Sequence, residues 1–237
     1  MLSKEEKGFT KDNLDAYLKE LAKEFRKLNE KAMKAEITLV GGAAILVNYD
    51  FRNMTMDIDA IIQASSAMKD AIRYVGDRYA LPYGWLNADF VRTKSYSSKL
   101  NQFSVYYRTF SNVLTVRTIS AEYLIAMKLR SGRKYKHDLS DVVGILAEHE
   151  KQGKPITMEM INKSVDDLYG GWKEIPNDSK KFVEEALKNG NYQKLYASIS
   201  NREKQLKGEL IDFEKTYPNV LKESNLDDII KHLKREE

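Results

Sequence analysis

The sequence contains no cysteine, which excludes disulfide bonds and thiolate-bound zinc. Its only histidines, His137, His149 and His232, are widely spaced, so a histidine metal cluster is not expected. No apolar run approaches the roughly 18 residues that span a bilayer, and the lysine-rich start MLSKEEK lacks the apolar core of a signal peptide. We therefore expect a cytoplasmic protein without a membrane partner.

A strong excess of one charge is also missing. Lysine and arginine number 39 against 35 aspartates and glutamates, which gives a net charge of +4 over 237 residues. This balance permits an anionic partner such as a nucleotide or RNA, but it does not indicate a DNA-binding protein. The 42% hydrophobic and 31% charged residues are typical of a soluble globular protein, and the length suits one large domain or a domain with a helical annex.

The most informative stretch is residues 36–62, EITLVGGAAILVNYDFRNMTMDIDAII. Its first part is a short β-branched run that ends in two glycines, and its last part alternates acidic and apolar residues. We predict a buried strand, a glycine turn, a short helix, a polar loop and a second strand, at Ile37–Val40, Gly41-Gly42, Ala43–Val47, Asp50–Thr55 and Met56–Ile62.

The remaining pattern predicts a β-hairpin and a series of amphipathic helices. The hairpin strands are expected at 103–108 and 113–118, and the helices at 10–33, 66–80, 120–130, 136–150, 157–168, 179–188, 191–216 (with or without a break) and 225–235. Gly153-Lys154-Pro155 is the best candidate boundary, dividing the chain into 1–152 and an all-helical 153–237. The fold class is therefore α+β, a small mixed sheet flanked by helices and followed by a helical region.

Two aspartates on the second strand, Asp57 and Asp59, are candidate metal ligands. Residues i and i+2 of a strand project from the same face, roughly 6.5–7 Å apart along the chain. Such a pair can share one hard cation, and carboxylate oxygens suit magnesium. An Asp-x-Asp pair is also common at ordinary strand edges, so the pair gains meaning only from its surroundings.

Those surroundings include the Gly41-Gly42 turn between a buried strand and a helix. Glycine serves any tight turn, but here it would present open backbone N–H groups at a helix N-terminus, where phosphate binds well. If the two strands are neighbours, the phosphate cradle and the aspartates lie at the same end of the sheet. The sequence thus predicts a site for a nucleoside triphosphate and magnesium.

Val40-Gly41-Gly42 followed by Asp57-Ile58-Asp59 resembles the signature of the nucleotidyltransferase superfamily typified by DNA polymerase beta. The nearer similarity is to its minimal bacterial branch, with the abortive-infection and toxin–antitoxin nucleotidyltransferase-like proteins. The resemblance covers about residues 35–150. Its other pieces are Arg52 and Thr55, the Gly-Trp-Leu-Asn segment at 84–87, and SAEYLIAMKLRSGRKYKHDLSDV at 120–142.

The resemblance implies that Gly41 and Gly42 contact the triphosphate while Asp57 and Asp59 bind Mg2+ and act in catalysis. It also implies that the nucleotide-binding residues include Arg52, Thr55, Lys128 and Arg133. Asp138 and Asp141 would orient the basic groups from the next helix.

One departure from the resemblance concerns the third carboxylate that catalytic members usually carry on a later strand. The corresponding strand here, residues 113–118, has no acid and presents Arg117. Asp89 is the nearest alternative in the sequence, although nothing in its spacing places it at the metal. The resemblance therefore argues for a nucleotide site more strongly than for turnover.

Several side chains have two interpretations from sequence. Lys128 either snorkels to solvent or faces the phosphates, and Arg52 either supports a phosphate or pairs with Asp57. Asp138 and Asp141 share a helix face, where an ion pair with Arg133 is the structural interpretation. Two aromatic residues, Trp85 and Tyr83, would stack on a base or anchor their loop. The cluster Arg130, Arg133, Lys134, Lys136 and His137 is either solvated surface or an RNA contact.

We hypothesise a magnesium-dependent transfer of a nucleotide from a nucleoside triphosphate to a hydroxyl of RNA (tRNA) or of a protein, in a toxin–antitoxin or phage-defence setting. The alternative is a non-catalytic binding module of the same fold that serves as the partner protein of a toxin–antitoxin pair. The absent third carboxylate favours that alternative.

Overall fold

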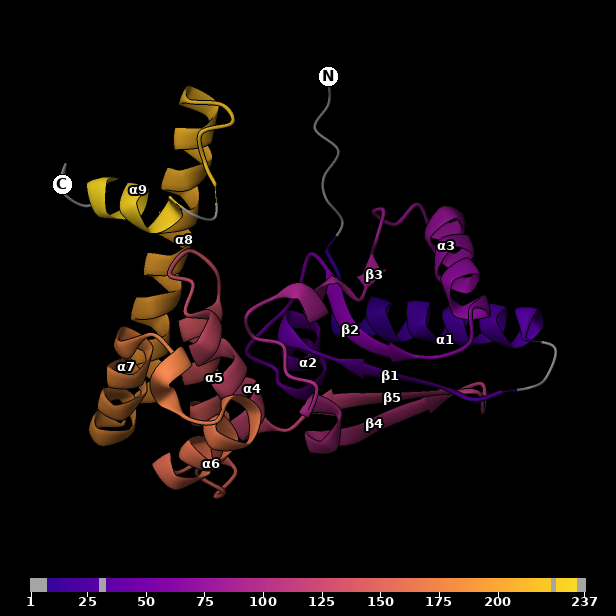
Figure 1. Ribbon diagram of the computed structural model, residues 1–237, viewed down its shortest axis with the longest axis horizontal. Coiled ribbons are helices and arrows are strands. Elements are labelled where there is room, and N and C mark those ends of the chain that lie inside the picture. The colour runs from indigo at the N-terminus through magenta and orange to yellow at the C-terminus, as the bar shows by residue number, and fades with distance from the viewer. Residues whose placement is uncertain (1–7, 30–32, 223–224, 234–237) are drawn as a thin grey trace.

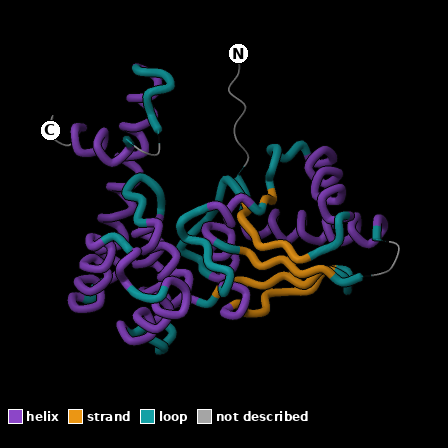
Figure 2. The backbone as a smooth tube through the Cα atoms, in the orientation of Figure 1, coloured by secondary structure: helices purple, strands orange, loops and turns teal. Residues whose placement is uncertain are grey.

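The computed structural model describes residues 8–29, 33–222 and 225–233. A five-stranded sheet occupies one side of the molecule and a group of helices the other (Figure 1, Figure 2). This arrangement confirms the α+β class. The strands are β1 Ala35–Leu39, β2 Ile58–Gln63, β3 Leu86–Asn87, β4 Ser104–Phe110 and β5 Leu114–Ile119.

The sheet is mixed, with strand order β3-β2-β1-β5-β4. β1 lies at its centre, antiparallel to β2 and parallel to β5, and its apolar side chains Ile37 and Leu39 are fully buried. Leu39 pairs with Ala60, so the carboxyl end of β1 meets the amino end of β2. That register brings the glycine turn and the aspartates to one end of the sheet.

Three helices cover the sheet: α1 Lys11–Leu28, α2 Gly41–Asn48 and α3 Ala67–Tyr79. α1 begins at a capping box, in which Thr10 and Asn13 bond each other's backbone N–H groups, and it packs along α3. α2 is apolar on nearly every side and is buried between the sheet and α4. The short apolar helix is therefore fixed against the carboxyl end of β1.

The other helices form the second side of the molecule (Figure 1). They are α4 Ala121–Ser131, α5 Asp138–Lys151, α6 Met158–Tyr169, α7 Asn177–Asn189, α8 Tyr192–Thr216 and α9 Leu226–Leu233. α6 packs on α4, and α8 packs along α5. Among the described residues, no helix combines the length and apolarity that crossing a membrane requires.

The hydrophobic core continues across Gly153. One cluster of buried residues includes Leu39 of β1, Ile145 of α5, Val165 of α6 and Val183 of α7. α4 and α5 precede the predicted boundary, yet they pack against α6 and α8, which follow it. The division into 1–152 and 153–237 stays a prediction.

The predicted elements correspond closely to the observed ones. The second strand begins at Ile58 and not at Met56, so the prediction that Asp57 lies on it is wrong, and Asp57 directly precedes β2. The loop after α3 contains the two-residue strand β3, which pairs with β2 and is too short to leave a sequence pattern. The helix expected at 191–216 runs without a break as α8. Residues 30–32 and 234–235, at the ends of two predicted helices, lie outside the described residues.

Gly144 allows a close approach between α5 and the loop after α2. A Cβ atom at Gly144 would lie 2.5 Å from the Phe51 ring, which stacks on Tyr49 and meets Tyr196 edge-on. Gly208 on α8 has open space at the same position. We predict that Gly144→Ala lowers the free energy of unfolding by about 1–3 kcal/mol because the held ring must move.

The matched control, Gly208→Ala, is expected to raise the free energy of unfolding by roughly 1 kcal/mol, the usual helix gain. Urea denaturation of both variants measures the difference. Stabilisation by both substitutions would contradict the prediction, because it would show that the Phe51 ring moves aside without an energetic penalty.

Candidate functional site

The turn after β1 is built around two glycines. Gly41 has φ +56°, a left-handed conformation that favours glycine, and it opens α2, whose first turn has no side-chain cap. A Cβ atom at Gly42 would lie 2.7 Å from Thr55 Oγ1 and 3.0 Å from Arg52 Nη2. The turn is therefore packed against the loop before β2. Its backbone N–H groups lie at the N-terminus of α2, where no side chain caps them.

The two aspartates lie directly beside this turn. The backbone N–H of Val40 donates to the carbonyl of Asp59 at 3.0 Å, and a Cβ atom at Gly41 would lie 3.8 Å from Asp59 Oδ2. Thr55 Oγ1 lies 3.2 Å from the carbonyl oxygen of Asp57 and 3.5 Å from its Oδ1. Asp57 precedes the first residue of β2, and Asp59 is its second.

The charge of the pair makes the site suitable for a cation. Burial and the neighbouring charge of Asp57 raise the pKa of Asp59, and a hydrogen bond from Asn87 and the charges of Lys136 and Arg133 partly offset this. A divalent cation between the carboxylates would relieve their repulsion, and oxygen donors suit Mg2+. The residues therefore fit a magnesium ion, although among the described residues no third acidic or histidine side chain joins the group.

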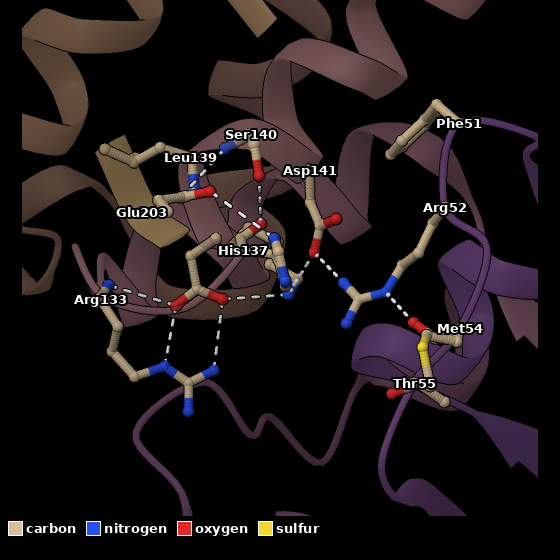
Figure 3. Close-up of polar contacts among 12 residues, drawn as sticks. Phe51, Arg52, Met54, Thr55, Arg133, His137, Leu139, Ser140, Asp141 and Glu203 are labelled. Atoms are coloured by element: carbon tan, nitrogen blue, oxygen red, sulfur yellow. Dashed lines mark hydrogen bonds and ion pairs between the residues drawn. The ribbon is translucent and has the colours of Figure 1, made fainter. Parts of the chain in front are cut away.

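A network of charges lies at the N-terminal turn of α5 (Figure 3). One of its members, Arg133, is close enough to the aspartate pair for its charge to lower the pKa of Asp59. Asp138 Oδ1 lies 3.0 Å from Lys128 Nζ and accepts from Arg133 Nη2, and its Oδ2 lies 2.8 Å from Arg133 Nε. Asp141 Oδ2 lies 2.8 Å from Lys128 Nζ and 2.7 Å from Arg52 Nη1. Asp138 is fully buried and the Lys128 side chain is 10% exposed.

The network shifts the pKa values of Asp138 and Lys128. Burial alone would raise the pKa of the Asp138 carboxyl, but Lys128 and Arg133 hold it well below its ordinary value. Burial alone would lower the pKa of Lys128, but Asp141 and Asp138 raise it. Asp138 and Lys128 therefore stay charged near neutral pH.

The structure tests the structural interpretations of Lys128, Arg52 and Arg133. Lys128 lies at the two carboxylates and not in solvent, so the snorkelling interpretation is wrong. Arg52 pairs with Asp141, so its expected pairing with Asp57 is also wrong, because the Arg52 side chain points toward α5. The predicted ion pair of Asp138 with Arg133 is confirmed. A role of Lys128, Arg133, Arg52 or Thr55 in nucleotide binding stays a prediction.

The strand expected to carry a third carboxylate is β5, and it presents Arg117 toward β4. There Arg117 donates to the hydroxyl and the carbonyl of Ser104 at 2.7 and 2.8 Å. Asp89 is mostly exposed and lies 3.7 Å from Arg92. Trp85 is buried against Gly76 and donates to a backbone carbonyl, so it anchors the loop, whereas Tyr83 is fully exposed.

Sequence reasoning did not assign Asn87 or Lys136 to the site, although both act on Asp59. Asn87 is brought there because it pairs with Asp59 across β2 and β3. Asn87 belongs to the Gly-Trp-Leu-Asn segment and Lys136 to the basic cluster, but neither pattern alone points to Asp59.

A glycine turn at a helix N-terminus beside a carboxylate pair at the start of a neighbouring strand is the arrangement of a nucleotidyltransferase-like site. In agreement, residues 16–172 match the family described as "Nucleotidyltransferase of unknown function (DUF6036)". The chain belongs to this family. We found no significant match among curated proteins or among solved structures.

The network predicts a pH-dependent loss of stability in Asp138→Asn. We expect the free energy of unfolding to fall by about 3–5 kcal/mol at pH 7, because Lys128 and Arg133 lose a buried partner. The folded pKa of Asp138 is below its ordinary value of 3.8, so the stabilisation is present above that value and is lost as the pH falls below it. The deficit of the variant should therefore shrink below about pH 4.

Urea denaturation between pH 3 and pH 8 measures this deficit. The control is Asp70→Asn, which removes an exposed i,i+3 pair with Arg73 and should cost at most about 1 kcal/mol. An equally small effect in both variants, or a deficit that does not change with pH, would contradict the account.

Proposed function

We propose that the protein transfers a nucleotide from a magnesium-bound nucleoside triphosphate to a hydroxyl of RNA, in particular tRNA, or of a protein side chain. The family match and the contact of the glycine turn with Asp59 support the proposal. A cytoplasmic location and a toxin–antitoxin or phage-defence setting, by analogy with similar proteins, are part of it. The single observation that carries it is the aspartate pair beside an uncapped helix N-terminus.

Each part of the site has a distinct task in this proposal. The backbone N–H groups of Gly41 and Gly42 hold the phosphates, aided by the α2 dipole. Asp57 and Asp59 hold the metal, which neutralises phosphate charge when it is bound. Arg133 and Lys136, whose charges reach Asp59, stabilise the remaining negative charge of the triphosphate.

In the proposed reaction, the acceptor oxygen forms a bond to the α-phosphorus. The bond from that phosphorus to the bridging oxygen of the β-phosphate breaks, and pyrophosphate leaves. The hydroxyl proton passes to water. Positioning of the reactants and neutralisation of charge supply the acceleration, since phosphoryl-type transfers need little covalent help from the protein.

A second function is favoured by a specific observation. Arg117 occupies β5, where a third carboxylate would be expected, and it is held by Ser104. A non-catalytic module that binds the nucleoside triphosphate and engages a partner protein is consistent with that residue. Nucleotide binding without transfer distinguishes this function from the first.

Replacement of either aspartate tests the proposal. We predict that Asp57→Ala and Asp59→Ala abolish magnesium-dependent nucleotide binding and transfer while the fold persists, because each removes a cation ligand at the partly exposed end of a strand. Isothermal titration with each of the four nucleoside triphosphates measures binding. Incubation with labelled triphosphate and total RNA or protein measures transfer.

The control is Asp50→Ala. The Asp50 side chain is 94% exposed, and its Oδ1 lies 3.8 Å from Lys11 Nζ in a weak surface pair. It should bind and transfer as the unaltered chain does. Unchanged activity in both Asp57→Ala and Asp59→Ala would refute the proposal. Binding that needs the aspartates, with no transfer to any acceptor, would favour the binding module.

A further inference from the structure

The N-terminal turn of α5 is capped by a residue from another helix. Its N-cap residue, His137, makes no side-chain cap. Instead, the backbone N–H groups of Leu139 and Ser140 donate to Glu203 Oε1 at 3.0 and 3.2 Å (Figure 3). A helix N-terminus leaves N–H groups without intrahelical partners, and a carboxylate there is favoured by the helix dipole. Thus α8 supplies the N-terminal cap of α5 that no residue next to α5 in the sequence provides.

The Glu203 carboxyl is buried, and the described residues do not supply a hydrogen-bond partner for each of its oxygens. Its side chain is 3% exposed, and within the part of the chain that the structure describes, its Oε2 has no hydrogen-bond partner. His137 Nδ1, which is cationic only when the ring is protonated, lies 3.8 Å from Oε2. Burial raises the pKa of Glu203 to about 7, against the lowering effect of its bonds to Ser140 and Leu139. Because the desolvation of this carboxyl is not fully offset by its hydrogen bonds, Glu203 is not expected to contribute much to the stability of the fold.

Attachment of α8 does not depend on this carboxyl. Elsewhere the helix contributes Tyr192 to the main core, and Leu195, Tyr196 and Ile199 pack against that core. The hydroxyl of Tyr196 also donates to the carbonyl of Phe51. An apolar residue at 203 would therefore keep α8 in place.

The capped turn carries the charges of the site. Asp138 and Asp141 lie in the first turn of α5, and between them they hold Lys128, Arg133 and Arg52. A shift of this turn moves both carboxylates together, and with them the cations beside the aspartate pair. Errors of about 1 Å in such groups lower rates by up to about a hundredfold.

We propose that Glu203 is a positioning residue of the nucleotide site, through which α8, beyond the family match that ends at residue 172, sets the place of the α5 charges. This inference rests on the proposed function. Glu203 makes no hydrogen bond or ion pair with Asp57, Asp59 or the Gly41-Gly42 turn. It acts through the backbone of Leu139 and Ser140.

Two substitutions of similar volume in the full chain separate positioning from packing. Glu203→Gln keeps an acceptor oxygen for the two N–H groups, whereas Glu203→Met fills the space without accepting a bond. We expect Glu203→Met to weaken binding of magnesium–nucleoside triphosphate, or to lower kcat/KM, by roughly ten- to a hundredfold, and Glu203→Gln to stay within about twofold. Glu209→Met, on the same helix, is the control.

Two readouts are needed, calorimetric titration of each triphosphate and hydrogen exchange of the amides of Leu139 and Ser140. Faster exchange and weaker binding in Glu203→Met, both restored in Glu203→Gln, would support the proposal. Wild-type binding by a folded Glu203→Met, or equal losses in both variants, would overturn it.

The exchange readout needs no activity, so it separates the two hypotheses. If the unaltered chain binds no triphosphate, the proposed function fails and positioning of a nucleotide site fails with it, even where exchange shows that Glu203 caps α5. If the unaltered chain binds and exchange in Glu203→Met is unchanged, only the role of Glu203 is overturned.

Discussion

The pairing of buried charges at the start of α5 is the interaction on which the site depends. Two carboxylates hold three cations that come from different segments: Arg52 from the loop before β2, Lys128 from α4, and Arg133 from the connection to α5. Each segment is thereby tied to one helical turn. Removal of one carboxylate would leave Lys128, which is almost fully buried, with one partner fewer, so the loss of a single member is costly to stability.

This network also connects the two sides of the molecule. The sheet supplies the glycine turn and the aspartate pair, and the helical side supplies the cations that face them. Arg52 and Thr55 both lie against Gly42, where a side chain would displace them. Glycine at position 42 is thus required by the packing of the neighbouring loop, independently of any phosphate.

The local parts of the site were predictable, because their signals are local. Gly41-Gly42 and Asp57/Asp59 are each a short pattern in a single segment of the chain, and the α+β class follows from the periodicity of the elements. Arg52 pairs with Asp141, 89 positions away, and that choice of partner is decided by tertiary packing. No pattern in the sequence distinguishes it from a pairing with Asp57.

Glu203 is the clearest case of what the sequence leaves out. It stands among charged residues of a long helix, 64 positions from Leu139, and nothing in its surroundings marks it as buried. Asn87 is similar, since it reaches Asp59 only through the pairing of a two-residue strand. Both depend on contacts between elements that are far apart in the sequence, and sequence periodicity does not predict such contacts.

The central claim is that the Gly41-Gly42 turn and the aspartate pair form one site for a metal-bound triphosphate. A crystal structure of the protein with Mn2+ and a non-hydrolysable nucleoside triphosphate tests it most directly. The account predicts an anomalous manganese peak at the carboxylates of Asp57 and Asp59, with phosphates at the N-terminus of α2. Manganese and triphosphate bound together elsewhere on the chain would contradict it.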